Sequence, residues 1–180
     1  MFFAPCMCQY TIQYPYPYYI NEPIYYRGGW RGYWTAPAEL EQLNRITLKD
    51  YGPQPYVVNI NEATKQNNTF RTALWTGHHL QVTLMSINVG EDIGLEIHPD
   101  TDQFLRIEQG RGVVRMGQNK NNLTFERKVD DDSAIMVPAG IWHNVINTGN
   151  VPLKLYTIYA PPHHPYGTVH RTKADAMAAE

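Results

Sequence analysis

Two side chains that can hold a metal ion lie two residues apart in the run Leu95-Glu96-Ile97-His98. Residues two apart in a β-strand project from the same face, so Glu96 and His98 point together while Leu95 and Ile97 point to the other side. A carboxylate facing a protein interior is costly to desolvate, and a bound divalent cation offsets that cost. The pair therefore predicts a metal site on one face of a strand.

The residues around this pair resemble the first motif of the cupin superfamily. That motif reads Gly, five residues, His-x-His, three or four residues, Glu, six residues, Gly. This chain offers Gly90, Glu96, His98, Gln103 and Gly110 at the corresponding positions. Every spacing fits, although Glu96 and Gln103 differ in type from the residues that the family places there.

A second stretch resembles the second cupin motif, which ends in Pro-x-Gly, two residues, His, three residues, Asn. Pro138, Gly140, His143 and Asn147 match it position by position. Asp132 stands where that motif usually opens with Gly. The resemblance implies an all-β cupin fold, a double-stranded β-helix or jelly-roll barrel, with an extended N-terminal arm and short terminal helices outside it.

The resemblance also implies that Glu96, His98, Gln103 and His143 hold one divalent ion. Two imidazole nitrogens with carboxylate and amide oxygens suit Zn²⁺, Mn²⁺, Fe²⁺ or Ni²⁺ and disfavour copper(I). A cupin without its metal is the alternative, because Gln103 is a weak neutral ligand. Pairing His98 with Asp100 instead is disfavoured, since only two residues then separate Asp100 from Gln103.

The ligand set is similar to that of mannose-6-phosphate isomerase-like cupins, which implies a metalloenzyme acting on a small, polar, sugar-like substrate. In those enzymes the paired ligand strand carries Gln-x-His and the carboxylate comes later, so Glu96 and Gln103 have exchanged places here. No Lys or Arg pair for a sugar phosphate stands out. The general base is left open.

Two other functions remain open. His98, His143 and Glu96 also match the two-histidine, one-carboxylate set of non-haem iron dioxygenases. Alternatively, the chain is a structural or assembly protein of spore-coat or surface-layer type, with the barrel as scaffold and a tyrosine-rich arm making the contacts. Deletion of residues 1–34 separates the latter from an enzyme, because assembly would collapse while metal content persists.

From Tyr56 onward, short runs rich in β-branched and aromatic residues alternate with Gly, Asn, Asp or Pro, which is typical of an antiparallel sandwich or barrel. We expect strands over 56–60, 70–76, 80–88, 93–98, 103–109, 112–117, 123–129, 133–137, 143–147 and 153–160. Thr172 is expected to cap a short terminal helix.

The first 44 residues differ in kind from the rest and are expected to form an arm, with the barrel and tail at 45–180. Eight of the thirteen tyrosines lie in residues 1–34 with several prolines, a composition that favours extended backbone. Thr35 is expected to cap a short helix over 36–44.

Histidines outside the two motifs are expected at the surface. His78 and His79 follow Gly77 at a predicted turn. His163, His164 and His170 come after the last expected strand, where an exposed loop is favoured because prolines commonly mark chain leaving a sheet. The alternative for these three is a tail that folds over the barrel mouth and contacts substrate.

Composition limits the partners. Lys and Arg total 15 against 17 acids, so nucleic acid is not expected to bind. No apolar run approaches the roughly 20 residues of a membrane span, so a cytoplasmic protein is expected, with the spore coat or surface layer as alternative.

Cys6 and Cys8 lack the partners of a zinc finger. Cupins commonly exchange terminal strands, so a homodimer or larger homo-oligomer is expected.

Overall fold

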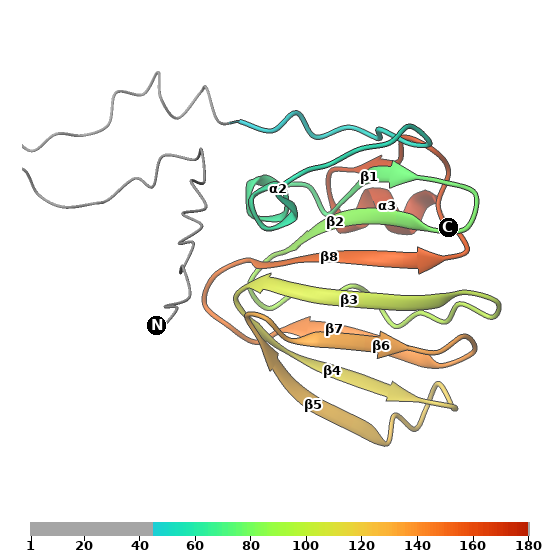
Figure 1. Ribbon diagram of the computed structural model, residues 1–180. Coiled ribbons are helices and arrows are strands. Elements are labelled where there is room, and N and C mark those ends of the chain that lie inside the picture. Colours follow the sequence, from blue (N-terminus) through green and yellow to red (C-terminus); the bar gives the residue numbers. More distant parts are fainter. Residues whose placement is uncertain (1–44, 180) are drawn as a thin grey trace, which may run out of the picture. The chain divides into compact units, whose positions relative to one another are not determined.

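The structure, a computed structural model, describes residues 45–179, which form two antiparallel sheets with two short helices (Figure 1). The six-stranded sheet has the order β6-β3-β8-β2-β1-β9, and the three-stranded sheet has the order β5-β4-β7. The strands are β1 (Arg71–Thr76), β2 (Gln81–Ile87), β3 (Asp102–Gln109), β4 (Arg111–Gly117), β5 (Phe125–Asp130), β6 (Ala134–Val137), β7 (Trp142–Asn147), β8 (Leu153–Ala160) and β9 (Val169–His170). The helices are α2 (Ile60–Gln66) and α3 (Lys173–Ala179).

The expected all-β cupin fold is confirmed, and eight of the ten expected strand ranges coincide with β1 to β8 to within two residues. The helix capped by Thr172 is confirmed as α3: the Thr172 N–H donates to Asp175 Oδ2 at 2.9 Å, and the Asp175 N–H donates to Thr172 Oγ1 at 3.2 Å. The arm, the helix expected over 36–44 and the boundary at residue 44 lie outside the described residues.

The buried face of the six-stranded sheet changes from polar at one end to apolar at the other. Strand pairing aligns residues of β2, β8 and β3 into rows whose side chains share one face. In order, the rows are Gln81-Tyr159-Gln103, Thr83-Thr157-Leu105, Met85-Leu155-Ile107 and the pair Ile87-Leu153. All of these residues are buried, so the sheet encloses one polar and one apolar region.

The opposite face of the same sheet is covered in part by the segment that precedes β1. Ile46, Leu48, Tyr56 and others of this segment pack with α2 against Leu84 and its neighbours in a second apolar cluster. Residues 56–60 were expected to be a strand, and that prediction is wrong. They make apolar contacts without a hydrogen-bonded neighbour strand and lead into α2.

Residues 93–98 were also expected to form a strand, but the structure has no strand there. This stretch pairs with β7 only through two isolated bridges, Asp92 with Ile146 and Glu96 with His143. Gly94 adopts φ +95°, a left-handed conformation that interrupts extended backbone. The segment therefore delivers Glu96 to the edge of β7 without forming a continuous ladder.

The two sheets do not close into one hydrogen-bonded barrel within residues 45–179, because β5 and β6 end the two sheets without pairing to each other. Asp132, in the turn between them, adopts φ +67°. Aspartate tolerates this left-handed conformation better than most residues, which explains how it can stand at a position where the cupin motif usually has glycine.

Candidate metal centre

Three side chains from the two motifs meet at one point. The Oε1 atom of Glu96 lies 3.4 Å from His98 Nε2 and 3.3 Å from His143 Nε2. The ligand atoms of the three residues lie within 4.8 Å of one another, a spacing at which a single metal ion can be held. His143 is fully buried, His98 is 5% exposed and the Glu96 side chain is 13% exposed.

Backbone hydrogen bonds bring the two motifs together. The Glu96 N–H donates to the His143 carbonyl at 3.0 Å, and the His143 N–H donates back to the Glu96 carbonyl at 2.9 Å. The Gly140 N–H donates to the His98 carbonyl at 2.8 Å, which ties the Pro-x-Gly turn to the first motif. Backbone hydrogen bonds therefore hold His143 beside Glu96 and His98, from which it is distant in sequence.

The protonation of His143 suits metal binding. Its Nδ1 lies 3.0 Å from the Ile141 carbonyl, and since a carbonyl only accepts, this nitrogen carries the proton. In the neutral ring, Nε2 then has a lone pair directed at the Glu96 carboxylate, and neither atom can donate to the other. A cation between them resolves this arrangement, as in metal sites where a backbone carbonyl orients the ligating imidazole.

Several buried polar atoms near this point have no hydrogen-bond partner among the described residues. They include both ring nitrogens of His98, Nε2 of His143 and Oε1 of Gln103. Leaving such atoms unpaired is costly, and proteins therefore rarely do so without a bound group. The residues present thus fit a divalent ion, with two imidazoles and one carboxylate as ligands.

The carboxyl group of Glu96 is held in its charged form. Burial alone would raise its pKa, but the imidazoles of His143 and His98, when protonated, donate to the carboxylate and lower the pKa below its ordinary value. Arg71, 1% exposed, adds a positive charge, with Nη2 3.9 Å from Glu96 Oε2. Sequence analysis missed Arg71; the only signal was a charge within the apolar run of a predicted strand.

Gln103, the fourth expected ligand, lies at the same polar end of the interior. It is 3% exposed and pairs across the sheet with Tyr159, whose ring centroid is 5.6 Å from that of His98. Its Nε2 donates to Thr157 Oγ1 at 3.1 Å, which leaves its carbonyl oxygen as the available ligand atom. Its role as a ligand stays a prediction.

The other histidines fall into two groups. His78 and His79 are exposed, as expected. The tail after β8 is a loop in which His163 is exposed, as expected, whereas His164 and His170 are partly buried. This loop also lies against the candidate metal centre, because the His163 ring centroid lies 4.0 Å from that of His98 and the His164 ring packs against Tyr159 at 5.0 Å. Contact of these histidines with a substrate stays a prediction.

Comparison with known proteins agrees with this geometry. Residues 83–159 match the Cupin domain family, and the chain belongs to the cupin superfamily. It is 67% identical over 175 residues to the Bacillus subtilis (strain 168) protein described as uncharacterized protein YrkC, covering 91% of this chain and 94% of that protein. A mimivirus relative, uncharacterized protein L612, is 44% identical over 117 residues, covering 64% of this chain and 71% of the relative.

Solved structures show the same fold. The crystal structure of BH2720 from Bacillus halodurans is 70% identical, covers 72% of this chain and 98% of its own, and superposes with a TM-score of 0.72. A conserved protein from Klebsiella pneumoniae with a double-stranded β-helix domain has a TM-score of 0.52 at 14% identity, covering 65% of this chain and 98% of its own. The latter likeness concerns the fold alone.

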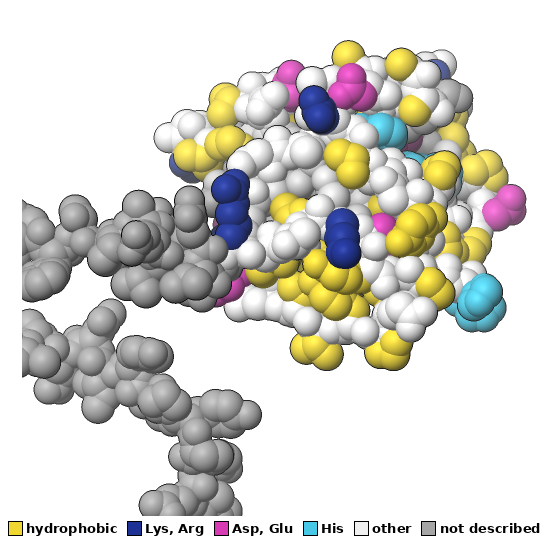
Figure 2. Space-filling model, turned by 90° about the horizontal axis from the view of Figure 1, so that it is seen from above, with side chains coloured by type: hydrophobic (Ala, Val, Ile, Leu, Met, Phe, Trp, Pro, Cys, Tyr) yellow, Lys and Arg dark blue, Asp and Glu magenta, His cyan; other side chains and the backbone are white. Residues whose placement is uncertain are grey.

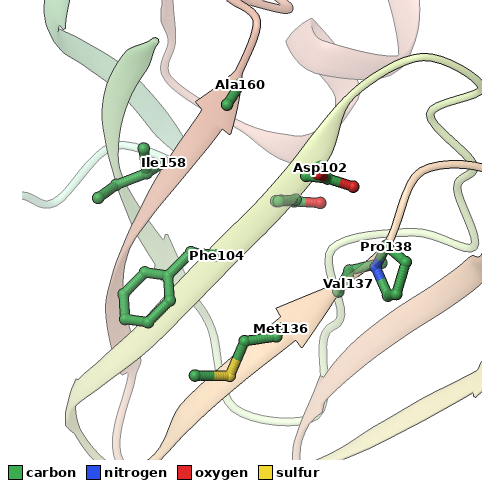
Figure 3. Close-up of a pocket in the computed structure, with 8 residues that line it drawn as sticks. Asp102, Phe104, Met136, Val137, Pro138, Ile158 and Ala160 are labelled. Atoms are coloured by element: carbon green, nitrogen blue, oxygen red, sulfur yellow. The ribbon is translucent and has the colours of Figure 1, made fainter.

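A separate apolar groove lies on the outer face of the six-stranded sheet (Figure 3). Phe104 pairs with Met136 of β6 and with Ile158 of β8, and Figure 3 shows these side chains coming from three neighbouring strands. Because Phe104 and Gln103 are adjacent in a strand, they project from opposite faces. The groove and the metal ligands therefore occupy opposite sides of the same sheet.

The charged surface gives no sign of a single basic patch on the face shown in Figure 2, where Lys and Arg side chains are separated by uncharged surface. The expectation that nucleic acid does not bind stays a prediction. Among residues 45–179, no helix is long and apolar enough to cross a membrane.

Proposed function

We propose that this cupin is a metalloenzyme in which Glu96, His98 and His143 hold a divalent ion, with Gln103 as a fourth ligand. The observation that carries the proposal is the convergence of two buried imidazole nitrogens on one carboxylate oxygen, at 3.3 and 3.4 Å. When bound, the ion supplies Lewis-acid polarisation of a substrate oxygen. Zn²⁺, Mn²⁺, Fe²⁺ and Ni²⁺ all suit these ligands.

The surrounding residues favour a small polar substrate of the sugar type. The interior rows next to the metal ligands carry hydroxyl and amide groups: Gln103, Tyr159, Thr83 and Thr157. Such groups form hydrogen bonds with hydroxyl-bearing molecules and reject apolar ones, which leave them unpaired. The Nδ1–H of His143, held by the Ile141 carbonyl, keeps the imidazole oriented while substrate binds.

A non-haem iron dioxygenase is the second candidate. The three residues that cluster are two histidines and one carboxylate, which is the ligand set that such enzymes use for Fe(II). This function predicts that the isolated protein contains iron and consumes oxygen with its substrate. A protein that contains only zinc would contradict it and leave the isomerase-like reaction as the proposal.

Elemental analysis of the purified protein tests the metal site. We expect the wild type to retain about one divalent ion per chain and His143→Ala to lose it, since one of the two imidazole ligands is removed. His79→Ala is the matched control, because His79 is exposed. Equal metal content in all three proteins, or none in the wild type after incubation with each of the four ions, would contradict the proposal.

A homo-oligomer and a small-molecule substrate remain predictions. The exposed apolar groove of Figure 3 is compatible with association through the outer face of the sheet, since exposed apolar patches often mark protein contacts. Size determination in solution by light scattering tests the oligomeric state, and a monomer across the micromolar range would contradict the prediction.

A further inference from the structure

The chain after β8 is fixed firmly against the sheet. The Gln81 side chain, which is fully buried, donates from Nε2 to the His164 carbonyl at 2.9 Å and accepts the His164 N–H at its Oε1 at 2.9 Å. Farther along, the Gly167 N–H donates to Asp50 Oδ2 at 3.0 Å, and the Ala73 N–H donates to the Thr168 carbonyl at 2.8 Å. The backbone on the C-terminal side of His163 is therefore held in place.

The ring of His163 is the next layer outside the metal ligands. Its centroid lies 4.0 Å from the His98 centroid with the planes tilted by 57°, and 5.7 Å from that of Tyr159 with the planes tilted by 28°. His98 is 5% exposed, whereas His163 is an exposed residue. On this side, the imidazole of His163 separates the buried ligand His98 from solvent.

We propose that His163 is the gate of the metal centre: its ring covers His98, holds that ring in its ligating orientation and moves aside for exchange of the ion or its small-molecule ligand. The inference rests on the proposed metal site. The backbone that follows His163 is held by Gln81, so rotation of the exposed His163 side chain supplies the movement. Neither cupin motif contains this residue.

The rate of metal release tests the gate. Each protein is loaded with Co²⁺, which suits the same ligands, mixed with excess EDTA and followed by its visible absorption. We expect His163→Ala to release Co²⁺ about tenfold faster than the wild type, in the range found when groups that support metal ligands are removed. His163→Phe should release the ion as slowly as the wild type, because it keeps a flat ring over His98.

His78→Ala serves as the control, since His78 is an exposed histidine in the turn between β1 and β2. Its release rate should equal that of the wild type. Release from His163→Ala at the wild-type rate would overturn the gate. So would rapid release from His163→Phe, because the imidazole would then act as a ligand and not as a cover.

Failure of the gate can be distinguished from failure of the metal site. If the wild type binds no Co²⁺, both proposals are overturned. If the wild type and His163→Ala bind Co²⁺ with the same stoichiometry and release it equally fast, only the gate is overturned. Because His163 is exposed, its substitution should leave the fold intact, which thermal unfolding of each variant verifies.

Discussion

The two ends of the molecule's interior are built from the same strands and differ in what those strands bury. At one end, Met85, Leu155 and Ile107 form an aligned apolar row, which belongs to the larger core cluster. At the other end, the same three strands bury Gln81, Tyr159 and Gln103 beside the metal ligands. The strand geometry is continuous, so the side chains alone make the ends different.

Because of this difference, we expect the stability of the protein and its metal binding to depend on different ends of the interior. Burial of apolar side chains stabilises the apolar end, whereas unpartnered polar atoms at the metal end lower the stability of the protein without an ion. The apolar end should therefore govern unfolding of the metal-free protein, and the polar end should govern metal affinity. Three substitutions and the addition of metal test this division.

Leu155→Ala should give the largest effect, because Leu155 is fully buried in the apolar row. We expect the free energy of unfolding of the metal-free protein to fall by about 2–5 kcal/mol, as for other buried leucines truncated to alanine. Denaturant unfolding measures the change. Val57→Ala, at a side chain that is 97% exposed, is the control and should change stability little. A loss below about 1 kcal/mol for Leu155→Ala would contradict this role of the apolar end.

Addition of metal should act through the polar end only. At a free concentration about 100 times Kd, the ion should raise the free energy of unfolding by about 2.7 kcal/mol in the wild type. The same increment is expected in Leu155→Ala, while His143→Ala should show none. Thermal or denaturant unfolding with and without Zn²⁺ measures it. An equal increment in His143→Ala would place the ion elsewhere.

Gln103→Leu replaces a buried polar side chain by an apolar one and so makes the polar end resemble the apolar end. Metal affinity should fall about tenfold, which corresponds to about 1.4 kcal/mol. The metal-free protein should change in stability by less than about 1 kcal/mol, since loss of the bond to Thr157 is offset by removal of an unpartnered amide oxygen. Competition with a chelating dye measures the affinity. Gln109→Leu, at the far end of β3, should retain wild-type affinity.

The smallest effect should come from Asp92, whose carboxylate binds Lys173 of α3 and accepts the Gly94 N–H at 2.7 Å. Burial raises the pKa of Asp92, but these two groups outweigh burial and lower it. The stability that the Asp92 carboxylate contributes is therefore present above the pKa of about 4 that this group has in the unfolded chain, and it is lost as pH falls below that value. Asp92→Asn should lose about 0.5 kcal/mol at neutral pH, a small effect because partly exposed ion pairs are screened, and progressively less as pH falls below about 4.

Unfolding of Asp92→Asn and the wild type across this pH range measures the difference. Asp131→Asn removes an exposed carboxylate and serves as the control. A difference between Asp92→Asn and the wild type that grows as pH falls would contradict the sign of the effect.

Sequence analysis located most strands because their apolar residues recur with the period of a half-buried sheet. It failed at residues 56–60, where alternation reflects packing on the outer face of a sheet, and it missed α2. A signal for α2 was present: Asn59 is followed three residues later by Glu62, and the Asn59 side chain accepts the Glu62 N–H at 3.2 Å.

For the candidate metal centre, the spacing within each motif was sufficient to predict that Glu96, His98 and His143 meet, because backbone pairing fixes where such positions lie. Arg71 and His163 could not be located in the same way. Arg71 reaches Glu96 from β1, and His163 reaches His98 through a tail held by Gln81. Both contacts depend on tertiary packing between distant segments, and no local pattern encodes them.

Crystallography of the metal-loaded protein at the absorption edge of the bound ion shows directly whether these three residues bind a metal. We expect one anomalous peak at bonding distance, about 2.0–2.2 Å, from Glu96 Oε1 and from the Nε2 atoms of His98 and His143. A peak bonded to other residues, or a loaded crystal in which these three side chains remain unliganded, would contradict the proposed metal site.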